Sequence, residues 1–566
     1  MKKKKLICIA LASVFAMSAG LLAACGDDDN GGGDGGDGEL KPVSELYPND
    51  FDFEPINWQG SKVDAYGGHD PVMVEAFDGN KPVYYSFSTD NATGGFVYGV
   101  QVRKSDDMIE WTKVGSAIKG FNSLKSENAV KSYIQSDACE IKEPYTVVSS
   151  FPDWSNPQKG PCWTLWAPDV IPAPTNTGKT VNGGWWLYSS WTAGFGSDQS
   201  LIFKLHSDNV AGPYEYDGII VQNSANDGGI NEIDPSLYWS ADGSKLYMSY
   251  GSFFGGIAVL ELDPATGLRK SGESVTTPGT TVITGGRIEG SVVAYHKVNI
   301  YTGDIGAADE DESKWTTKSQ YYMMGSDENL SKNYTMRVWT SDNPDSGFTS
   351  IRGNKGLQVG GAWTWRKQGE PTLEDLNYYI PGHNDMLTTK DGRNLIVYHN
   401  RTEEGSDFGG NHYTYTSLYD FNSKGQLVIS ANRYAGERIG LVTAADVTSL
   451  TNGKYSVVKM TSSDPAYEQK LNVAYAQDCE FHADGTITGA VEGTWKVYGT
   501  HYVYIKLTDG TEYYGSAMPA FIRQYDANGL YGWKGNGGLT ISAVTDTTTT
   551  GTTNGENGIL YFNMQF

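Results

Sequence analysis

Five stretches of this sequence repeat one pattern, in which a polar residue beside small residues or proline comes directly before a short apolar, strand-forming run. The polar residues are Asp70, Asp169, Asp234, Glu289 and His383. Repeated β units are the sequence signature of a propeller, whose blades stand radially around a central channel. If the innermost strand of each blade begins at the same mouth, these five side chains converge there. The pattern therefore predicts an all-β, five-bladed β-propeller with a site at its axis.

A second set of strands supports this interpretation. Each polar strand start is followed by a β-branched or aromatic run bounded by turn residues, at 83–87, 185–189, 246–250, 321–324 and 395–399. The units are unequally spaced, so the first and fourth are expected to carry insertions, at 116–160 and 296–320. We assign residues 46–450 to the propeller.

The repeat fades near residue 445, and a new series of alternating strands follows. Several short strands joined by turns within about 110 residues are typical of a small antiparallel barrel. We assign residues 455–566 to a C-terminal β-barrel domain. Its expected role is to pack against the propeller, and carbohydrate binding is the alternative.

The N-terminus has the features of a secretory signal. A run of lysines precedes an apolar stretch and small residues, which predicts a signal peptide over residues 1–24. Leu22-Ala23-Ala24-Cys25 resembles a bacterial lipobox, which implies lipidation of Cys25; a soluble secreted protein is the alternative. The acidic, glycine-rich residues 25–45 are expected to form a flexible tether. They resemble the surface-export signal of Bacteroides-type lipoproteins, which implies a lipoprotein of the outer membrane exposed on the cell surface and held by its lipid anchor alone.

Charge and cysteine content narrow the class of protein further. The chain has 67 acidic and 43 basic residues, and this excess of negative charge argues against nucleic acid as a partner. A Cys139–Cys162 disulfide is chemically allowed in an oxidising compartment, and the sequence leaves open whether it forms. No cysteine or histidine spacing suggests structural zinc.

The motifs taken in order resemble glycoside hydrolase family 43, and within it the endo-α-1,5-L-arabinanases, over about residues 67–433. They include His69-Asp70-Pro71, Trp166-Ala167-Pro168-Asp169, Ile233-Asp234-Pro235-Ser236, Arg287-Ile288-Glu289-Gly290 and Tyr398-His399-Asn400-Arg401. The C-terminal barrel resembles that of the larger two-domain arabinanases. The resemblance implies an inverting enzyme that cleaves internal α-1,5 bonds of arabinan. Glu232 departs from the family pattern, and its charge is expected to narrow or repolarise a subsite.

Inverting hydrolysis needs one carboxylic acid to protonate the leaving oxygen and one carboxylate to activate water. The resemblance implies that Asp70 is the general base and Glu289 the general acid, and that Asp169 lies near Glu289 and raises its pKa. It also implies that His383 helps to hold one calcium ion in the central channel. Expected substrate contacts are Trp166, Asn231, Asp234, Ser252 and Phe254. The alternative for the aspartates is that they cap tight turns at strand starts.

Two other functions stay open from the sequence. One is an exo-acting arabinofuranosidase or xylosidase of the same family, with one end of its cleft closed by the insertions. The other is a non-catalytic propeller that binds glycans, although such a protein has no need of a complete acid and base set. The expected substrate is arabinan or arabino-oligosaccharide, and a monomer is expected.

Overall fold

The computed structural model describes residues 40–42, 68–90, 98–156, 163–174, 184–306, 310–353, 355–370, 376–401, 412–461, 472–524, 534–545 and 557–566. The predicted signal peptide, Cys25 and most of the predicted tether lie outside these residues. Cys162 lies outside them too, so the predicted disulfide with the buried Cys139 stays a prediction. The helices in the described ranges are all too short or too polar to cross a bilayer.

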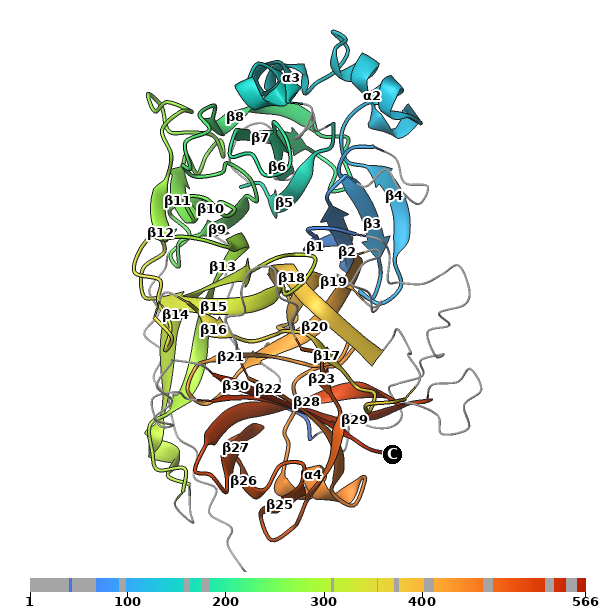
Figure 1. The fold of residues 1–566 in the computed structure, drawn as a ribbon, viewed down its shortest axis with the longest axis vertical. Coiled ribbons are helices and arrows are strands. Elements are labelled where there is room, and N and C mark those ends of the chain that lie inside the picture. Colours follow the sequence, from blue (N-terminus) through green and yellow to red (C-terminus); the bar gives the residue numbers. More distant parts are fainter. Residues whose placement is uncertain are drawn as a thin grey trace, which may run out of the picture.

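The predicted five-bladed propeller is confirmed (Figure 1). Four blades are four-stranded antiparallel sheets in which sequence order equals spatial order. They contain β1 (Val72–Asp78), β2 (Lys81–Ser88), β3 (Gln101–Ser105) and β4 (Thr112–Ser116); β5 (Trp166–Pro172), β6 (Trp185–Thr192), β7 (Ser200–Ser207) and β8 (Glu215–Asn223); β9 (Ser236–Trp239), β10 (Leu246–Tyr250), β11 (Ile257–Leu262) and β12 (Thr280–Ile283); and β13 (Ile288–Tyr301), β14 (Trp315–Asp327), β15 (Thr335–Ser341) and β16 (Leu357–Gln358).

The fifth blade belongs to a larger sheet. Its strands are β17 (Trp363–Thr364), β18 (Asn377–Thr388), β19 (Asn394–Arg401), β20 (Tyr413–Phe421) and β21 (Leu427–Ile429). A sixth strand, β23 (Ala474–Tyr475), joins this sheet parallel to β17. Because β23 follows the first barrel strand in the sequence, the chain returns to the propeller before it completes the barrel.

The first blade closes the ring by packing against blades on both sides. Successive side chains of β1 point to opposite faces, as in any strand. Val72 and Val74 lie in one hydrophobic cluster with Leu187 of the second blade. Met73, between them, lies in another cluster with residues of the fifth blade, including Leu395. An inner blade strand packs against neighbours on both faces, so it needs apolar side chains on both.

The first predicted insertion is helical and covers the outside of the first two blades. It contains η2 (Phe121–Ser123), α2 (Glu127–Ile134), α3 (Lys142–Ser149) and η3 (Pro152–Ser155). The side chain of Ser126 caps α2 by accepting a hydrogen bond from the Ala129 N–H. Val130 and Ile134 of α2 are fully buried in the cluster that these two blades share.

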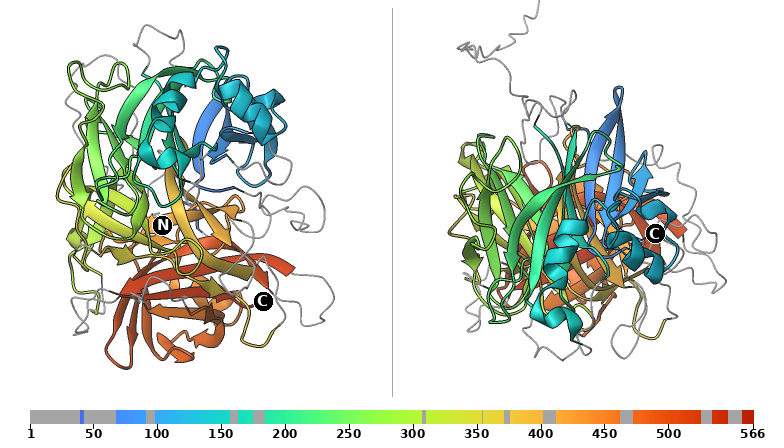
Figure 2. Two further views of the ribbon diagram at one scale, coloured as in Figure 1. Left: turned by 45° about the horizontal axis from the view of Figure 1, so that its top comes forward. Right: turned by 90° about the horizontal axis from the view of Figure 1, so that it is seen from above.

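The prediction of a separate insertion at 296–320 is wrong, because these residues extend two strands of the fourth blade. These residues lengthen β13 and β14 into one long hairpin that runs beside the barrel (Figures 1 and 2). Trp315 at the start of β14 stacks on Tyr502 of the barrel, with ring centroids 4.9 Å apart. The hairpin therefore joins the two domains.

The predicted C-terminal barrel is also confirmed. Eight antiparallel strands close on themselves, and α4 (Ala444–Ser449) precedes them. The strands are β22 (Lys454–Thr461), β24 (Gln477–Phe481), β25 (Thr486–Gly489), β26 (Gly493–Tyr498), β27 (Tyr502–Leu507), β28 (Glu512–Gln524), β29 (Lys534–Thr545) and β30 (Gly558–Met564). The barrel interior is filled by buried apolar side chains such as Phe481, Ile541 and Phe562.

A buried polar contact joins the barrel to the fifth blade. Asp420 of β20 lies with one carboxylate oxygen 2.7 Å from His501 Nε2 and accepts a hydrogen bond of 2.5 Å from the Ser516 hydroxyl. Burial raises the pKa of a carboxyl, yet His501 and Ser516 keep the pKa of Asp420 below its usual value. The domain contact therefore depends on an ionised aspartate.

Candidate active site

Each of the five inner strands has a residue with a left-handed backbone at or near its start, except that in β18 this residue, His383, lies at a bulge within the strand. The φ angles are +53° at Asp70, +37° at Ala167, +60° at Asp234, +57° at Gly290 and +45° at His383. Such angles are unfavourable for residues other than glycine, and strain of this kind gathers at functional sites. Residues of these turns line one small cavity of about 20 Å³ at the mouth of the channel. The five predicted polar residues therefore come together, as the sequence pattern predicts, although Glu289 itself lies just outside the cavity lining.

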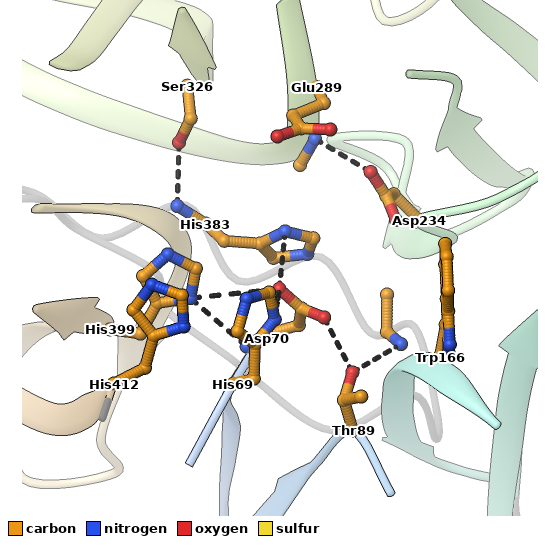
Figure 3. A network of polar contacts seen from close by, with 12 residues as sticks. His69, Asp70, Thr89, Trp166, Asp234, Glu289, Ser326, His383, His399 and His412 are labelled. Carbon is orange, nitrogen blue, oxygen red and sulfur yellow. Dashed lines mark hydrogen bonds and ion pairs between the residues drawn. The ribbon is translucent and has the colours of Figure 1, made fainter. Parts of the chain in front are cut away.

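Asp70 is buried and surrounded by donors. Its Oδ2 accepts a hydrogen bond of 2.5 Å from Thr89, and its Oδ1 lies 2.6 Å from His69 Nδ1 and 2.9 Å from His383 Nδ1 (Figure 3). Burial alone raises the pKa of a carboxyl, but His383 and His69 hold the pKa of Asp70 well below its usual range. Asp70 is therefore ionised at neutral pH.

Glu289 lies across the site, on the far side of the His383 ring (Figure 3). Its two carboxyl oxygens accept hydrogen bonds of 2.7 Å from the hydroxyls of Ser252 and Tyr334. These bonds favour the ionised form, but burial outweighs them and, with the negative charge of Asp70, raises the pKa of Glu289. The pKa values of Asp70 and Glu289 are thus shifted in opposite directions.

Asp234 is the carboxyl that lies beside Glu289 (Figure 3). Its Oδ2 accepts a hydrogen bond of 3.2 Å from the backbone N–H of Gly290. Burial, with the negative charges of Glu289 and Asp70, raises the pKa of Asp234 to about 8 in spite of the positive charge of His383. Asp234 and Glu289 therefore repel each other when both are ionised.

Asp169 is buried and lines the same cavity as Asp234 and Gly290. Its oxygens accept backbone hydrogen bonds of 2.8 Å from Val170 and 2.6 Å from Leu237. Burial and the negative charge of Asp385 raise the pKa of Asp169 to about 8. The charge that acts on Asp169 is thus Asp385, and the predicted effect of Asp169 on Glu289 stays a prediction.

Two models of protein families match the chain. The model of glycosyl hydrolases family 43 matches residues 63–303, and a model described as a C-terminal lipocalin-like domain matches residues 431–548. Together the two matches span more than half of the sequence. The chain belongs to glycoside hydrolase family 43.

Named relatives agree with this assignment. The chain is 27% identical over 495 residues to the extracellular endo-α-(1→5)-L-arabinanase 2 of Bacillus subtilis, a match that covers 81% of this chain and 87% of that protein. It is 25% identical over 480 residues to the extracellular endo-α-(1→5)-L-arabinanase of Thermotoga petrophila, covering 78% and 85%. The crystal structure of the endo-1,5-α-L-arabinanase from Thermotoga petrophila RKU-1 has the same fold, with a TM-score of 0.63 at 22% identity over 88% of this chain and 99% of that one.

The channel of this family 43 hydrolase has the donor chemistry that a calcium ion needs. Calcium binds oxygen ligands, and Asp169, Asp234 and Asp385 all turn toward the cavity with pKa values raised by burial. Asn384, which also lines the cavity, is 4% exposed, and both its amide atoms lack a hydrogen-bond partner among the described residues. The residues present therefore fit a hydrated cation near His383.

Three further histidines of this family 43 hydrolase cluster behind Asp70. One ring nitrogen from each of His69, His399 and His412 lies within 4.8 Å of the others. The Asp70 N–H donates to His399 Nδ1 at 3.3 Å, and the Arg401 guanidinium donates to His412 Nε2 at 2.7 Å. A metal ion shared by the three rings would have to displace these hydrogen bonds. As folded, the cluster supports the position of Asp70.

The predicted substrate contacts divide into two groups. Trp166 is partly exposed and Phe254 is 37% exposed, so both are open to a ligand. Asn231 and Ser252 are buried and act inside the protein, where Asn231 accepts a hydrogen bond of 2.7 Å from Ser200 and Ser252 donates to Glu289. Asp234 is buried too, but it lines the cavity.

Glu232 does not face the substrate. Its side chain is 2% exposed and interacts with Tyr250 and Arg269. Burial raises the pKa of Glu232 to about 8, although Tyr250 and Arg269 lower it. The expectation that Glu232 narrows or repolarises a subsite is therefore not supported by its position.

Sequence patterns missed several supporting side chains. Thr89 donates to Asp70 and accepts the Ala167 N–H at 2.8 Å, so it ties the first two inner strands together. The Ser326 hydroxyl accepts the backbone N–H of His383 at 2.6 Å. Tyr334 belongs to a family motif, but the sequence gives no sign that its hydroxyl binds Glu289. These partners lie on other strands, so no local spacing reveals them.

Proposed function

We propose that this family 43 glycoside hydrolase cleaves internal α-1,5-L-arabinofuranosidic bonds of arabinan with inversion. The observation that carries the proposal is a pair of buried carboxyls on opposite sides of the His383 ring, with Asp70 held by histidines and Thr89 and Glu289 held by two hydroxyls. The pKa of Asp70 is lowered and that of Glu289 is raised. Inverting hydrolysis needs this pair of protonation states. The substrate follows from the relatives, two of which are named endo-α-(1→5)-L-arabinanases.

In the proposed reaction, Asp70 accepts a proton from a water molecule that attacks the anomeric carbon. Glu289 donates its proton to the departing glycosidic oxygen, and the bond between that oxygen and the anomeric carbon breaks. Burial and the negative charge of Asp70 keep Glu289 protonated, and Asp169 has the orienting role that the resemblance implies. His69, His383 and Thr89 fix the Asp70 carboxylate in position.

We propose further that His383 and the channel residues Asn384, Asp169 and Asp385 hold one hydrated calcium ion. A calcium ion there would supply positive charge to a region crowded with buried carboxyls. Chelation should lower the melting temperature, and calcium titration calorimetry should detect one site that His383→Ala weakens. No heat of binding to the chelated protein would refute this assignment.

The experiment that tests the function is a time course of products from linear arabinan. Mixed arabino-oligosaccharides at early times are expected, and proton NMR should show the inverted anomer first. Arabinose alone would favour the exo-acting alternative. Binding of arabinan without any hydrolysis would favour the glycan-binding propeller.

The same relatives are named extracellular, which agrees with a secreted or surface enzyme. We propose that the protein is a monomeric lipoprotein of the outer membrane, held at the cell surface through Cys25. Cys25→Ala should then appear in the soluble fraction. Continued membrane association of that variant would argue against the lipid anchor.

A further inference from the structure

The helical insertion contacts two loops that border the active site. Asp153 of η3 accepts hydrogen bonds of 3.0 Å at its Oδ2 from the Ser197 hydroxyl and from the Asn226 side-chain amide. Its backbone N–H donates to Gln199 Oε1 at 2.7 Å. Gln199 in turn donates to the Ser224 carbonyl at 2.7 Å. One aspartate thus joins the β6–β7 loop (residues 193–199) to the β8–β9 loop (residues 224–235).

The β6–β7 loop carries an aromatic side chain that the catalytic scheme does not use. Phe195 is 71% exposed, and its ring centroid lies 6.3 Å from that of Trp166, at the start of an inner strand. Next to this open ring, Ser197 and Gln199 are 2% and 1% exposed. The loop is therefore anchored at its base while its aromatic side chain faces solvent.

The contacts continue from these loops toward Glu289. Asp198 accepts the Gly228 N–H at 2.8 Å, and the Gly229 carbonyl accepts the Gly255 N–H at 3.0 Å. Gly255 follows Phe254, the second aromatic residue exposed at this rim. The Phe253 N–H then donates to the Ile288 carbonyl, directly before Glu289. A continuous series of hydrogen bonds connects the insertion, two exposed phenylalanines and the proposed acid.

We propose that Asp153 is a positioning residue that holds the rim loops so that Phe195 and Phe254 receive an extended arabinan chain. This inference rests on the proposed function for its substrate. Exposed rings offer apolar faces to sugar rings, and a loop ordered before binding loses less conformational entropy when the ligand arrives. Asp153 contributes to binding of the polymer and takes no part in bond cleavage.

The test compares Asp153→Ala with Asp137→Ala, whose carboxylate lies on the same insertion and pairs with Lys142 at the surface. Asp153→Ala should raise KM for linear arabinan about 10-fold, the effect of losing hydrogen bonds to a charged group. Its kcat, and its kcat/KM on an aryl arabinofuranoside too short to reach the rim, should stay close to the wild-type values. Asp153→Asn keeps an acceptor oxygen and should restore most of the affinity. Asp137→Ala should match wild type throughout.

A second measurement does not depend on activity. Chymotrypsin should cleave after Phe195 faster in Asp153→Ala than in wild type, and Ser197→Ala should give a milder form of the same change. An unchanged KM on linear arabinan, an unchanged cleavage rate after Phe195, or an equal loss on the short substrate would overturn the inference. If wild type fails to cleave linear arabinan while the variant is cut faster after Phe195, the proposed substrate is wrong and the loop contact stands.

Discussion

His383 Nδ1 lies 2.9 Å from Asp70 Oδ1 and joins the last inner strand of the propeller to the start of the first. Burial alone lowers the pKa of an imidazole, but the carboxyls of Asp70, Asp234 and Glu289 raise the pKa of His383 to about 9. The same contact lowers the pKa of Asp70. The position of one imidazole therefore determines the protonation state of the proposed base.

Gly290 is the residue that makes room for this imidazole. Its φ is +57°, and a Cβ atom there would lie 3.0 Å from both Cγ and Nδ1 of His383. Gly290→Ala should move the ring away from Asp70 and lower kcat on linear arabinan about 10- to 100-fold, because small displacements in an active site are costly. Steady-state kinetics with a melting curve would measure both effects.

Gly286→Ala is the matched control for this change. Gly286 also has a positive φ, +83°, but a Cβ atom there has no neighbour within 4 Å. Both variants should lose about 1–2 kcal/mol of unfolding free energy from the backbone alone. If Gly286→Ala lost as much activity as Gly290→Ala, the contact with His383 would not be the reason.

Tyr334→Phe should shift the pH profile. The Tyr334 hydroxyl donates to Glu289 and lowers its pKa, so without it Glu289 keeps its proton to a higher pH and the alkaline limb of kcat/KM moves to higher pH. Asp169→Asn should move that limb to lower pH if Asp169 raises the pKa of Glu289, as the resemblance implies. The two pH profiles, measured on one substrate, separate the two influences. An unchanged limb in Tyr334→Phe would show that Glu289 is not the group that titrates there.

Asp420→Ala should weaken the contact between the propeller and the barrel. It leaves His501 and Ser516 without their buried partner, and breaking a buried pair of this kind costs about 3–5 kcal/mol of unfolding free energy. The pKa of Asp420 is lower in the folded protein than in the unfolded chain, where an aspartate has a pKa of about 3.9. Its contribution to the unfolding free energy is therefore fully present above about pH 3.9 and is lost as the pH falls through the pKa of the folded state.

Urea unfolding at pH 7 and at acid pH measures this difference. Asp106→Ala, which removes an exposed ion pair with Lys81, is the control and should change the unfolding free energy little. A deficit in Asp420→Ala that did not shrink at low pH would show that the ionised carboxylate is not the source of the stability.

Much of this architecture follows from the sequence because propeller blades repeat. Asp70, Asp169, Asp234 and Glu289 lie at strand starts, so a periodic pattern is enough to bring them to one mouth. His383 reaches the same mouth from a bulge within β18, and not from the strand start that the pattern predicts. The pattern does not show which of these side chains contact one another. Asp169 and Asp234 begin neighbouring blades, and only the left-handed turns and backbone donors around each carboxyl decide that Asp234 meets the Gly290 N–H and Asp169 the Leu237 N–H.

Contacts between distant strands were beyond sequence reasoning for a similar physical reason. Tyr334 reaches Glu289 from directly before β15 of the same blade, and Ser326 reaches His383 from the neighbouring blade. Strand periodicity contains no information about which hydroxyl makes such a contact. The long hairpin at 296–320 looked like an insertion because a strand that leaves its blade to meet another domain breaks the repeat length. Trp315 of this hairpin packs on Tyr498 and Tyr502 of the barrel, and the sequence pattern does not indicate that contact.

The most direct test of the catalytic assignment is Glu289→Ala measured on two substrates. On linear arabinan, where the leaving sugar needs a proton, kcat should fall about 10²–10⁴-fold, the usual contribution of general acid catalysis. On an aryl α-1,5-arabinotrioside with a low-pKa phenol, which leaves without a proton, the loss should be much smaller. An equal loss on both substrates, or near-native hydrolysis of linear arabinan, would contradict the assignment of Glu289 as the general acid.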